Sequence, residues 1–331
     1  MNLSGSIICV SEISSGNALS LSTPLPYKRE IIPRRLMAMG AGSQFLQIVF
    51  ASITNGSVYV LVAIGINVIY NATEVVNFAH GPFVMLGAMI AASLVASKGI
   101  PLPFAFVISV AIVAAAGALL EFFGIRSMKK PSVANFVIMT LGAGIIIEGV
   151  AMVLWGKEAF SLPSFFGEEP VKIMGAALHP QAIWILTVAI SIIIILTAYY
   201  KFTISGKAML ACSINRDMAR LLGIKASQIS TLSFVIGGAI GATAGILIAP
   251  ITLTAYYQGL WWILKGFTAS IMGGLGNIIG AIIGGFLLGF LESFSSGYIS
   301  SGSKDIVVFI ILILVLYLRP KGILGEIERE H

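Results

Sequence analysis

Residues 36–73, LMAMGAGSQFLQIVFASITNGSVYVLVAIGINVIYNAT, contain no Asp, Glu, Lys or Arg. Two further stretches, 226–264 and 266–291, are equally free of charged residues. Each stretch exceeds the roughly 20 residues that an α-helix needs to cross about 30 Å of hydrocarbon. The sequence therefore predicts an all-α integral membrane protein.

The composition points the same way. Charged residues make up 10% of the chain and hydrophobic residues 57%, whereas about a quarter of a soluble domain is charged. One soluble core of this size cannot bury so much apolar surface, so lipid must solvate part of it. Cys9 and Cys212 are too few for a disulfide framework, and we interpret both as apolar filler rather than catalytic residues.

Apolar runs separated by turn and charge signals predict about eight or nine transmembrane helices. The seventh run is rich in Gly and Trp and the last is short, which leaves the exact count open. The candidate spans are 44–70, 82–97, 102–123, 132–155, 181–200, 228–249, 259–275, 277–296 and 304–318.

The loops between the spans predict their direction. The basic segments 126–130, 201–225 and 319–321 are expected in the cytoplasm under the positive-inside rule. The segment 157–172, with three Glu and two Lys, is expected outside. Nine crossings satisfy all four assignments and place the N-terminus outside. Because the basic residues lie in these loops, the net charge of +6 does not indicate nucleic-acid binding.

Residues 1–40 differ from the rest and do not fit a signal peptide, because their basic cluster 28–35 follows the short apolar cluster 7–10. We interpret them as a disordered tail, or as the product of a start codon placed upstream of Met37 or Met39. The basic cluster would lie on the external side with nine crossings. A broken or re-entrant early span is the alternative explanation.

Two weakly similar units, 53–88 and 237–276, each contain a Gly-rich span, a polar turn and a second Gly-rich helix. They start on opposite sides with nine crossings, which predicts an inverted repeat, a common plan for transport proteins. Chance similarity of Gly-rich apolar sequence is the alternative. Glycines at 237, 241 and 245, and at 276, 280, 284 and 289, are predicted to pack helices closely in lipid.

The basic segment 206–225 is predicted to form one amphipathic helix that ends with Gly223 at the C′ position. Arg216 and Arg220 lie one turn apart on its polar face, and Ala, Met and Leu line the other face. Such a helix can rest on anionic lipid head groups. The small, adaptable apolar face equally suits a groove on another protein.

Five segments together resemble the permeases of binding-protein-dependent ABC importers, in particular the H-type permease of branched-chain amino acid importers. The segments are NGSVYVLVAIG (55–65), VNFAHG (76–81), GKAMLACSINRDMARLLGI (206–224), KGFTASIMGGLG (265–276) and RPKGILG (319–325). Gly266 and Met272 depart from the Ala and Leu of the family pattern. The resemblance covers 44–325 in order and implies a permease domain over 41–325 with a cytoplasmic coupling loop at 201–226.

The resemblance implies a transport subunit, not an enzyme, that lies in the inner cell membrane in contact with lipid. It implies a second permease, two cytoplasmic ATPases that bind the ATP, and a periplasmic or extracellular solute-binding protein. No phosphate-binding loop of the Gly-x-x-x-x-Gly-Lys-Ser/Thr type occurs in the sequence, and no cofactor is expected. Relatives serve urea and short amides, so the substrate stays open. The residues implied to couple to the ATPases are Gly206, Asn215, Arg216, Asp217, Arg220 and Gly223.

Polar residues at membrane depth usually face a cavity or a partner, so Asn77, His80 and Glu148 are candidates to line the pathway. His80 is alternatively a structural residue bonded to a carbonyl. We expect Glu292 to be solvated near the external interface. A proton-coupled secondary transporter that uses Glu148, Glu292 and His80 as a relay is the alternative function. A membrane assembly or signalling protein is a third, but it leaves the basic helix unexplained.

Overall fold

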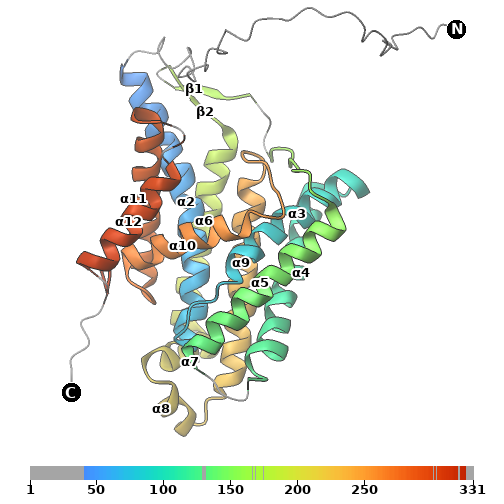
Figure 1. The fold of residues 1–331 in the computed structure, drawn as a ribbon, viewed down its shortest axis with the longest axis vertical. Helices are drawn as coiled ribbons and strands as arrows, with labels where there is room; N and C mark the ends of the chain where they lie inside the picture. The colour runs from blue at the N-terminus through green and yellow to red at the C-terminus, as the bar shows by residue number, and fades with distance from the viewer. Residues whose placement is uncertain are drawn as a thin grey trace, which may run out of the picture. The chain divides into compact units, whose positions relative to one another are not determined.

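The structure, a computed structural model, describes residues 41–128, 132–165, 167, 169–173, 175–300, 302, 304–319 and 321–325. The segment 1–40, interpreted above as a tail, lies outside the described residues. A π-helical turn, η1 (Leu120–Ile125), extends α4, and β1 (Val171–Ile173) and β2 (Ala176–Leu178) form an antiparallel hairpin. The helices in Figure 1 are α2 (Ala41–Thr73), α3 (His80–Lys98), α4 (Leu102–Leu119), α5 (Val133–Trp155), α6 (Pro180–Phe202), α7 (Ile204–Ile214), α8 (Arg216–Leu221), α9 (Ala226–Ile248), α10 (Gly259–Gly273), α11 (Ile278–Tyr298) and α12 (Lys304–Leu318).

Each predicted span corresponds to a helix, and the all-α membrane fold is confirmed. Among the described residues, seven helices are long and apolar enough to cross a bilayer: α2, α3, α4 with η1, α5, α6, α9 and α11. The helices α10 and α12 have 15 residues each. Each is therefore about 22 Å long, which is shorter than the hydrocarbon layer. The helices α10 and α12 therefore account for the difference between the seven helices of sufficient length and the nine candidate spans.

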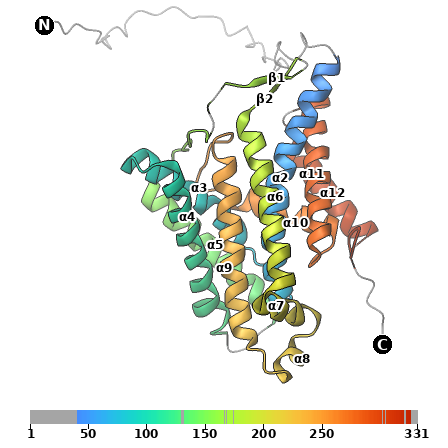
Figure 2. The ribbon, with the colours of Figure 1, turned by 180° about the vertical axis from the view of Figure 1, so that it is seen from behind.

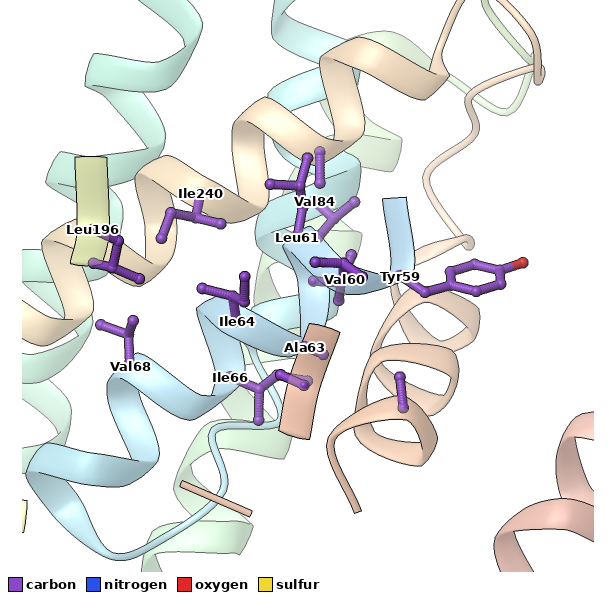
Figure 3. Packing of buried hydrophobic residues seen from close by; sticks show 14 of the residues in the cluster. Tyr59, Val60, Leu61, Ala63, Ile64, Ile66, Val68, Val84, Leu196 and Ile240 are labelled. Atoms are coloured by element: carbon purple, nitrogen blue, oxygen red, sulfur yellow. The ribbon is translucent and has the colours of Figure 1, made fainter. Parts of the chain in front are cut away.

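The spans differ strongly in how far their neighbours cover them. The most apolar window of α2 is 72% buried, as is that of α9, whereas the corresponding windows of α4–η1, α5 and α6 are only 17–22% buried. Side chains of Val58–Val68 in α2 pack against residues of α3, α6 and α9, as Figure 3 shows for Val84, Leu196 and Ile240. The helices α2 and α9 therefore form the centre of the bundle, and α4, α5 and α6 expose apolar side chains to its surroundings.

The helix α3 begins inside the bundle. Its first residue, His80, is completely buried and lies against Gly65 in α2 and Gly241 in α9. The chain leaves the end of α2 and turns back into the bundle over residues 74–79 (Figure 1). The Phe78 N–H donates to the Thr140 hydroxyl of α5 at 3.2 Å. The start of α3 is therefore held among α2, α5 and α9.

Glycines permit the close approach of central helices. A Cβ at Gly245 would overlap the Val84 carbonyl, and one at Gly284 would overlap the Ala269 carbonyl. Close backbone contact through small residues is how helices associate in lipid, where the hydrophobic effect does not drive them together. The predicted role of these glycines in packing is confirmed. The inverted repeat itself stays a prediction, although the second helices of the two units, α3 and α10, contact each other.

The basic segment was predicted to form one helix, but it forms two, α7 and α8. Asn215 ends α7 and begins α8, and its side-chain oxygen accepts from the N–H groups of Asp217 at 3.1 Å and Met218 at 2.9 Å. A side chain that caps a new helix in this way competes with continuation of the old one. The predicted C′ glycine is confirmed: Gly223 has a φ of +85° and its N–H bonds the Arg220 carbonyl at 3.0 Å.

The hairpin β1–β2 lies at the end of the bundle opposite α7 and α8 (Figure 2), as the predicted external and cytoplasmic positions require. Its second strand is fixed to α2 by one side chain. The Gln47 amide donates to the Ala177 carbonyl at 3.0 Å and accepts from the Ala177 N–H at 2.8 Å. One amide group thus satisfies both backbone groups of a strand residue that no third strand covers.

The end of the described chain is bound to the turn between α10 and α11. The N–H groups of Ile323 and Leu324 donate to the carbonyls of Met272 at 2.8 Å and Gly273 at 3.0 Å. The Asn277 amide, at the start of α11, donates to the Leu324 carbonyl at 3.1 Å. The segments KGFTASIMGGLG and RPKGILG, far apart in the sequence, therefore form one structural unit.

Candidate translocation and coupling sites

The starts of two helices meet beside α5. A Cβ on Gly259, the first residue of α10, would lie 3.0 Å from the Cα of Pro82 and 2.5 Å from the Glu148 Oε1. The Glu148 carboxylate also lies near the backbone of Leu260 in the first turn of α10. A carboxylate at a helix N-terminus is favoured by the free N–H groups and the helix dipole. We refer to this meeting of Pro82, Gly259 and Glu148 as the helix-start junction.

The stripe of α5 that reaches the junction consists of Thr140, Gly144 and Glu148, one turn apart. Thr140 bonds the segment before α3, and Gly144 contacts Pro82. Glu148 is only partly buried, although a carboxylate at membrane depth rarely faces lipid. The junction therefore opens toward the surface of the subunit on which α5 lies.

Asn77 and His80 lie immediately before and at the start of α3. The Asn77 side-chain oxygen accepts from the Ala79 N–H at 3.0 Å, while its amide nitrogen has no partner within the described part of the chain. The His80 ring lies near the backbone of Val62, yet neither ring nitrogen makes a hydrogen bond of acceptable geometry. The structure thus gathers all three pathway candidates around the first turn of α3, with His80 on the side facing α2 and α9.

Gly65→Ala is expected to destabilise the protein through His80. The new Cβ would lie 2.6 Å from the ring Nε2, and a Cβ at Gly241 would lie 3.1 Å from the ring Cε1, so both glycines lie against the ring. The ring has no space into which it can move, so we expect the free energy of unfolding to fall by about 2 kcal/mol. His80→Ala in the same chain should recover part of that loss, which the thermal midpoint of the solubilised protein measures.

The matched control for this pair is Gly149→Ala, since nothing lies within 4 Å of a Cβ at Gly149. Its effect should add to that of His80→Ala. Simple additivity of Gly65→Ala and His80→Ala would contradict the placement of the ring between the two glycines.

A second buried polar group was not predicted. The Lys265 ammonium of α10 lies 2.8 Å from the Glu292 Oε1 of α11 and 3.5 Å from the Asp305 Oδ1 of α12. The Tyr59 hydroxyl of α2 donates to the Glu292 Oε2 at 2.6 Å. Figure 3 shows the Tyr59 ring extending away from Leu61 and Ile64. We call Tyr59, Lys265, Glu292 and Asp305 the four-helix network.

The expectation that Glu292 is solvated near the external interface is wrong. Glu292 is 4% exposed and bonded to two helices, because burial of its charge requires partners. Its sequence signal is present: Lys265 alone divides two charge-free stretches, and Glu292 ends the second. A lone cation and a lone anion at membrane depth predict that they pair.

The coupling segment presents an apolar surface to its surroundings. Met209 and Cys212 of α7 and Ala219 of α8 face the bundle and are buried. Burial raises the pKa of the Cys212 thiol, although nearby Arg216 and Arg220 oppose the shift, so the thiol stays protonated near neutral pH. The exposed apolar residues of the segment include Leu210, Ile214, Met218, Leu221 and Leu222.

This finding corrects the composition of the exposed face, which was predicted from its Ala and Met content. The outward side chains are mainly Ile and Leu, and Leu221 and Leu222 are each 81% exposed. Charged groups flank them: Arg220 pairs with Asp217 at 3.2 Å on the surface, and the buried Arg216 Nε has no hydrogen-bond partner among the residues that the structure describes. Gly206 lies against the backbone of Tyr199 and Tyr200 and so sets the approach of α7 to the end of α6.

The part of the chain that the structure describes holds no cluster of three or more His, Cys, Asp or Glu suited to a metal ion. A groove of about 620 Å³ lies between η1 and α5, among Leu120, Phe123, Met139 and Ala143. Its lining is almost wholly apolar, so it does not suit a zwitterionic solute.

The family model described as "Branched-chain amino acid transport system / permease component" matches residues 48–316. The chain belongs to this family. It is 35% identical over 301 residues to the high-affinity branched-chain amino acid transport system permease protein LivH of Escherichia coli (strain K12), covering 86% of this chain and 97% of LivH. It is 33% identical over 302 residues to the permease protein BraD of Pseudomonas aeruginosa, with the same coverage of both chains.

A more distant member of the family is the probable branched-chain amino acid transport permease protein LivH of Methanocaldococcus jannaschii, 29% identical over 297 residues, with 83% of this chain and 90% of that protein covered. The chain is thus a multi-pass membrane permease of the branched-chain amino acid transport family. Within this permease, the segments that carried the resemblance form the four places described above. These are α2 with the network, the start of α3, the coupling segment, and the turn between α10 and α11.

Proposed function

We propose that this permease is one of two membrane subunits of an inner-membrane ABC importer for branched-chain or related amino acids. The observation that carries the proposal is the exposed apolar surface of α8, flanked by Arg216 and Arg220 and held by the caps at Asn215 and Gly223. Exposure of Met218, Leu221 and Leu222 does not stabilise an isolated membrane subunit. Burial of these side chains against a protein partner would stabilise the complex.

The partner of this surface is proposed to be one of two cytoplasmic ATPases. Apolar side chains on a short helix suit a groove, and Asp217, Arg216 and Arg220 supply charges at its rim. ATP binds to the ATPases, and the permease itself needs no cofactor. A second permease and a solute-binding protein outside the membrane complete the importer, and the binding protein supplies most of the ligand selectivity.

The coupling segment contacts the two central helices of the bundle directly. The helix α7 packs on α2 and α9 through Met209 and Cys212. The same two helices enclose His80 at the start of α3. When ATP-driven closure of the ATPases displaces α7 and α8, the starts of α3 and α10 shift with α2 and α9. We propose that Asn77, His80 and Glu148 lie along the pathway that this shift opens.

A proton-coupled secondary transporter fits the geometry less well. A proton relay needs titratable groups within hydrogen-bond reach of one another, and both His80 nitrogens lack partners among the described residues. Glu292 belongs to a separate group, bonded to Lys265 and Tyr59. An importer for urea or short amides shares the same architecture and differs in its binding protein.

Reconstitution in proteoliposomes tests the proposal. The permease alone is expected to show no uptake of labelled leucine under a pH gradient. With its second permease, ATPases and binding protein, ATP should drive uptake. Excess unlabelled leucine should compete, whereas urea and acetamide should not. Uptake by the permease alone would favour the secondary transporter. Competition by urea or acetamide would indicate that the importer carries urea or short amides instead of branched-chain amino acids.

A further inference from the structure

The short helix α10 depends on its protein neighbours for its position. It is about 22 Å long, so both of its ends lie within the bundle. Gly259 at its start lies against Pro82, and Gly273 at its end lies against Gly280. A helix that crosses the whole bilayer is held in depth by its two polar flanks. In α10, by contrast, the first turn forms part of the helix-start junction.

Close packing brings α10 against α2 and α11. The contacts run through small groups: Gly266 lies against Val62, and Gly284 lies against Ala269. Such small residues let the helix backbones approach closely. A buried polar pair adds directional contacts that are satisfied in only one register.

The four-helix network supplies that pair. Lys265 lies six residues after Gly259, which is about 9 Å along the helix. Its side chain is 12% exposed and that of Glu292 is 6% exposed. The Lys265 ammonium also lies 3.3 Å from the Tyr59 hydroxyl, so three neighbouring helices bond one group on α10. Rotation of α10 by one residue, about 100°, would break all of these contacts.

We propose that Lys265 and Glu292 are positioning residues that set the rotation and depth of α10, and thereby the place where its first turn meets Pro82 and Glu148. The inference rests on the proposed transport function, because the junction is the part of the pathway that it concerns. Neither residue needs to contact the solute.

The test separates positioning from stability. Lys265→Met alone leaves Glu292 buried without its cation and should lower the yield of folded protein. The double variant Lys265→Met/Glu292→Met removes both charges and leaves no buried charge of this pair unpaired. We expect its thermal midpoint to stay close to the original. In the full importer, the maximal uptake rate should fall about tenfold while the KM for the solute is unchanged. Lys265→Arg, which keeps the cation, should retain most of the rate.

A second measurement does not depend on transport. The rings of Phe78, just before α3, and Phe267, in α10, have centroids 5.9 Å apart. With Cys9 and Cys212 replaced by Ser, the pair Phe78→Cys/Phe267→Cys should react rapidly with a short bifunctional thiol reagent in membranes. Adding the double Met variant should slow this cross-linking several-fold. Lys98→Met, an exposed cation at the end of α3, is the matched control and should change neither measurement.

The outcomes are distinct. Cross-linking at the original rate in the double Met variant, or full recovery of uptake together with stability, would overturn the positioning role. Failure of the unmodified importer to take up amino acids, with slowed cross-linking in the double variant, would reject the proposed function and keep the positioning role.

Discussion

Replacing Leu221 and Leu222 by Asp is expected to abolish ATP-driven uptake. Both side chains are 81% exposed at the end of α8, and burial of one Leu side chain against a partner contributes about 2 kcal/mol. Loss of both therefore weakens association with the ATPase by roughly a hundredfold or more. Two carboxylates in an apolar groove add a desolvation cost. Retention of the ATPases on the purified permease measures the loss directly.

The matched control is Leu253→Asp, in the loop before α10. Leu253 is 61% exposed, and its neighbour Thr254 pairs with Phe160 of the segment predicted to be external. This variant should keep both ATPases bound. Equal retention of ATPases by the Leu221/Leu222 variant would show that α8 contacts lipid instead of a protein.

Gly284→Ala is expected to prevent formation of a stable protein. The added Cβ would overlap the Ala269 carbonyl and lie 2.8 Å from the Gly273 N. Both neighbours are backbone atoms of α10, so no side-chain rotation relieves the clash and the two helices must separate. We expect the free energy of unfolding to fall by about 3 kcal/mol, which is a large fraction of the stability of most proteins. The yield of monodisperse protein in mild detergent reports the effect.

Gly142→Ala is the control for this prediction. Gly142 also lies within a transmembrane helix, but nothing lies within 4 Å of a Cβ at its position. The substitution should leave the yield unchanged or raise stability by up to about 1 kcal/mol through helix propensity. A normal yield for Gly284→Ala would mean that α10 and α11 are farther apart than the structure shows.

The sequence predicted the membrane class, a helix at each candidate span and the C′ position of Gly223, because each depends on a local property. The absence of charge over 20 or more residues marks a span, and a Gly after a short helix marks its end. The break at Asn215 was predictable too. Asn at a helix start with Asp217 in the first turn is an N-cap signal, but the surrounding basic periodicity obscured it.

The depth of His80 was beyond a local pattern, and the pairing of Lys265 with Glu292 required two isolated charges in different helices to be considered together. A helix surrounded by protein on all sides has no polar face, so its periodicity does not show where it begins relative to the bilayer. Lys265 and Glu292 lie on two adjacent helices that are joined by a turn. Only the close approach of those helices, set by glycines such as Gly284, brings the two charges together.

The bonds from Ile323 and Leu324 to the turn after α10 have a consequence for biosynthesis. These residues follow all the described helices in the sequence, so they are synthesised after α10, α11 and α12. The carbonyls of Met272 and Gly273 therefore cannot obtain these partners when α10 and α11 first enter the membrane. The order of synthesis thus places closure of this turn after insertion of the helices that it joins.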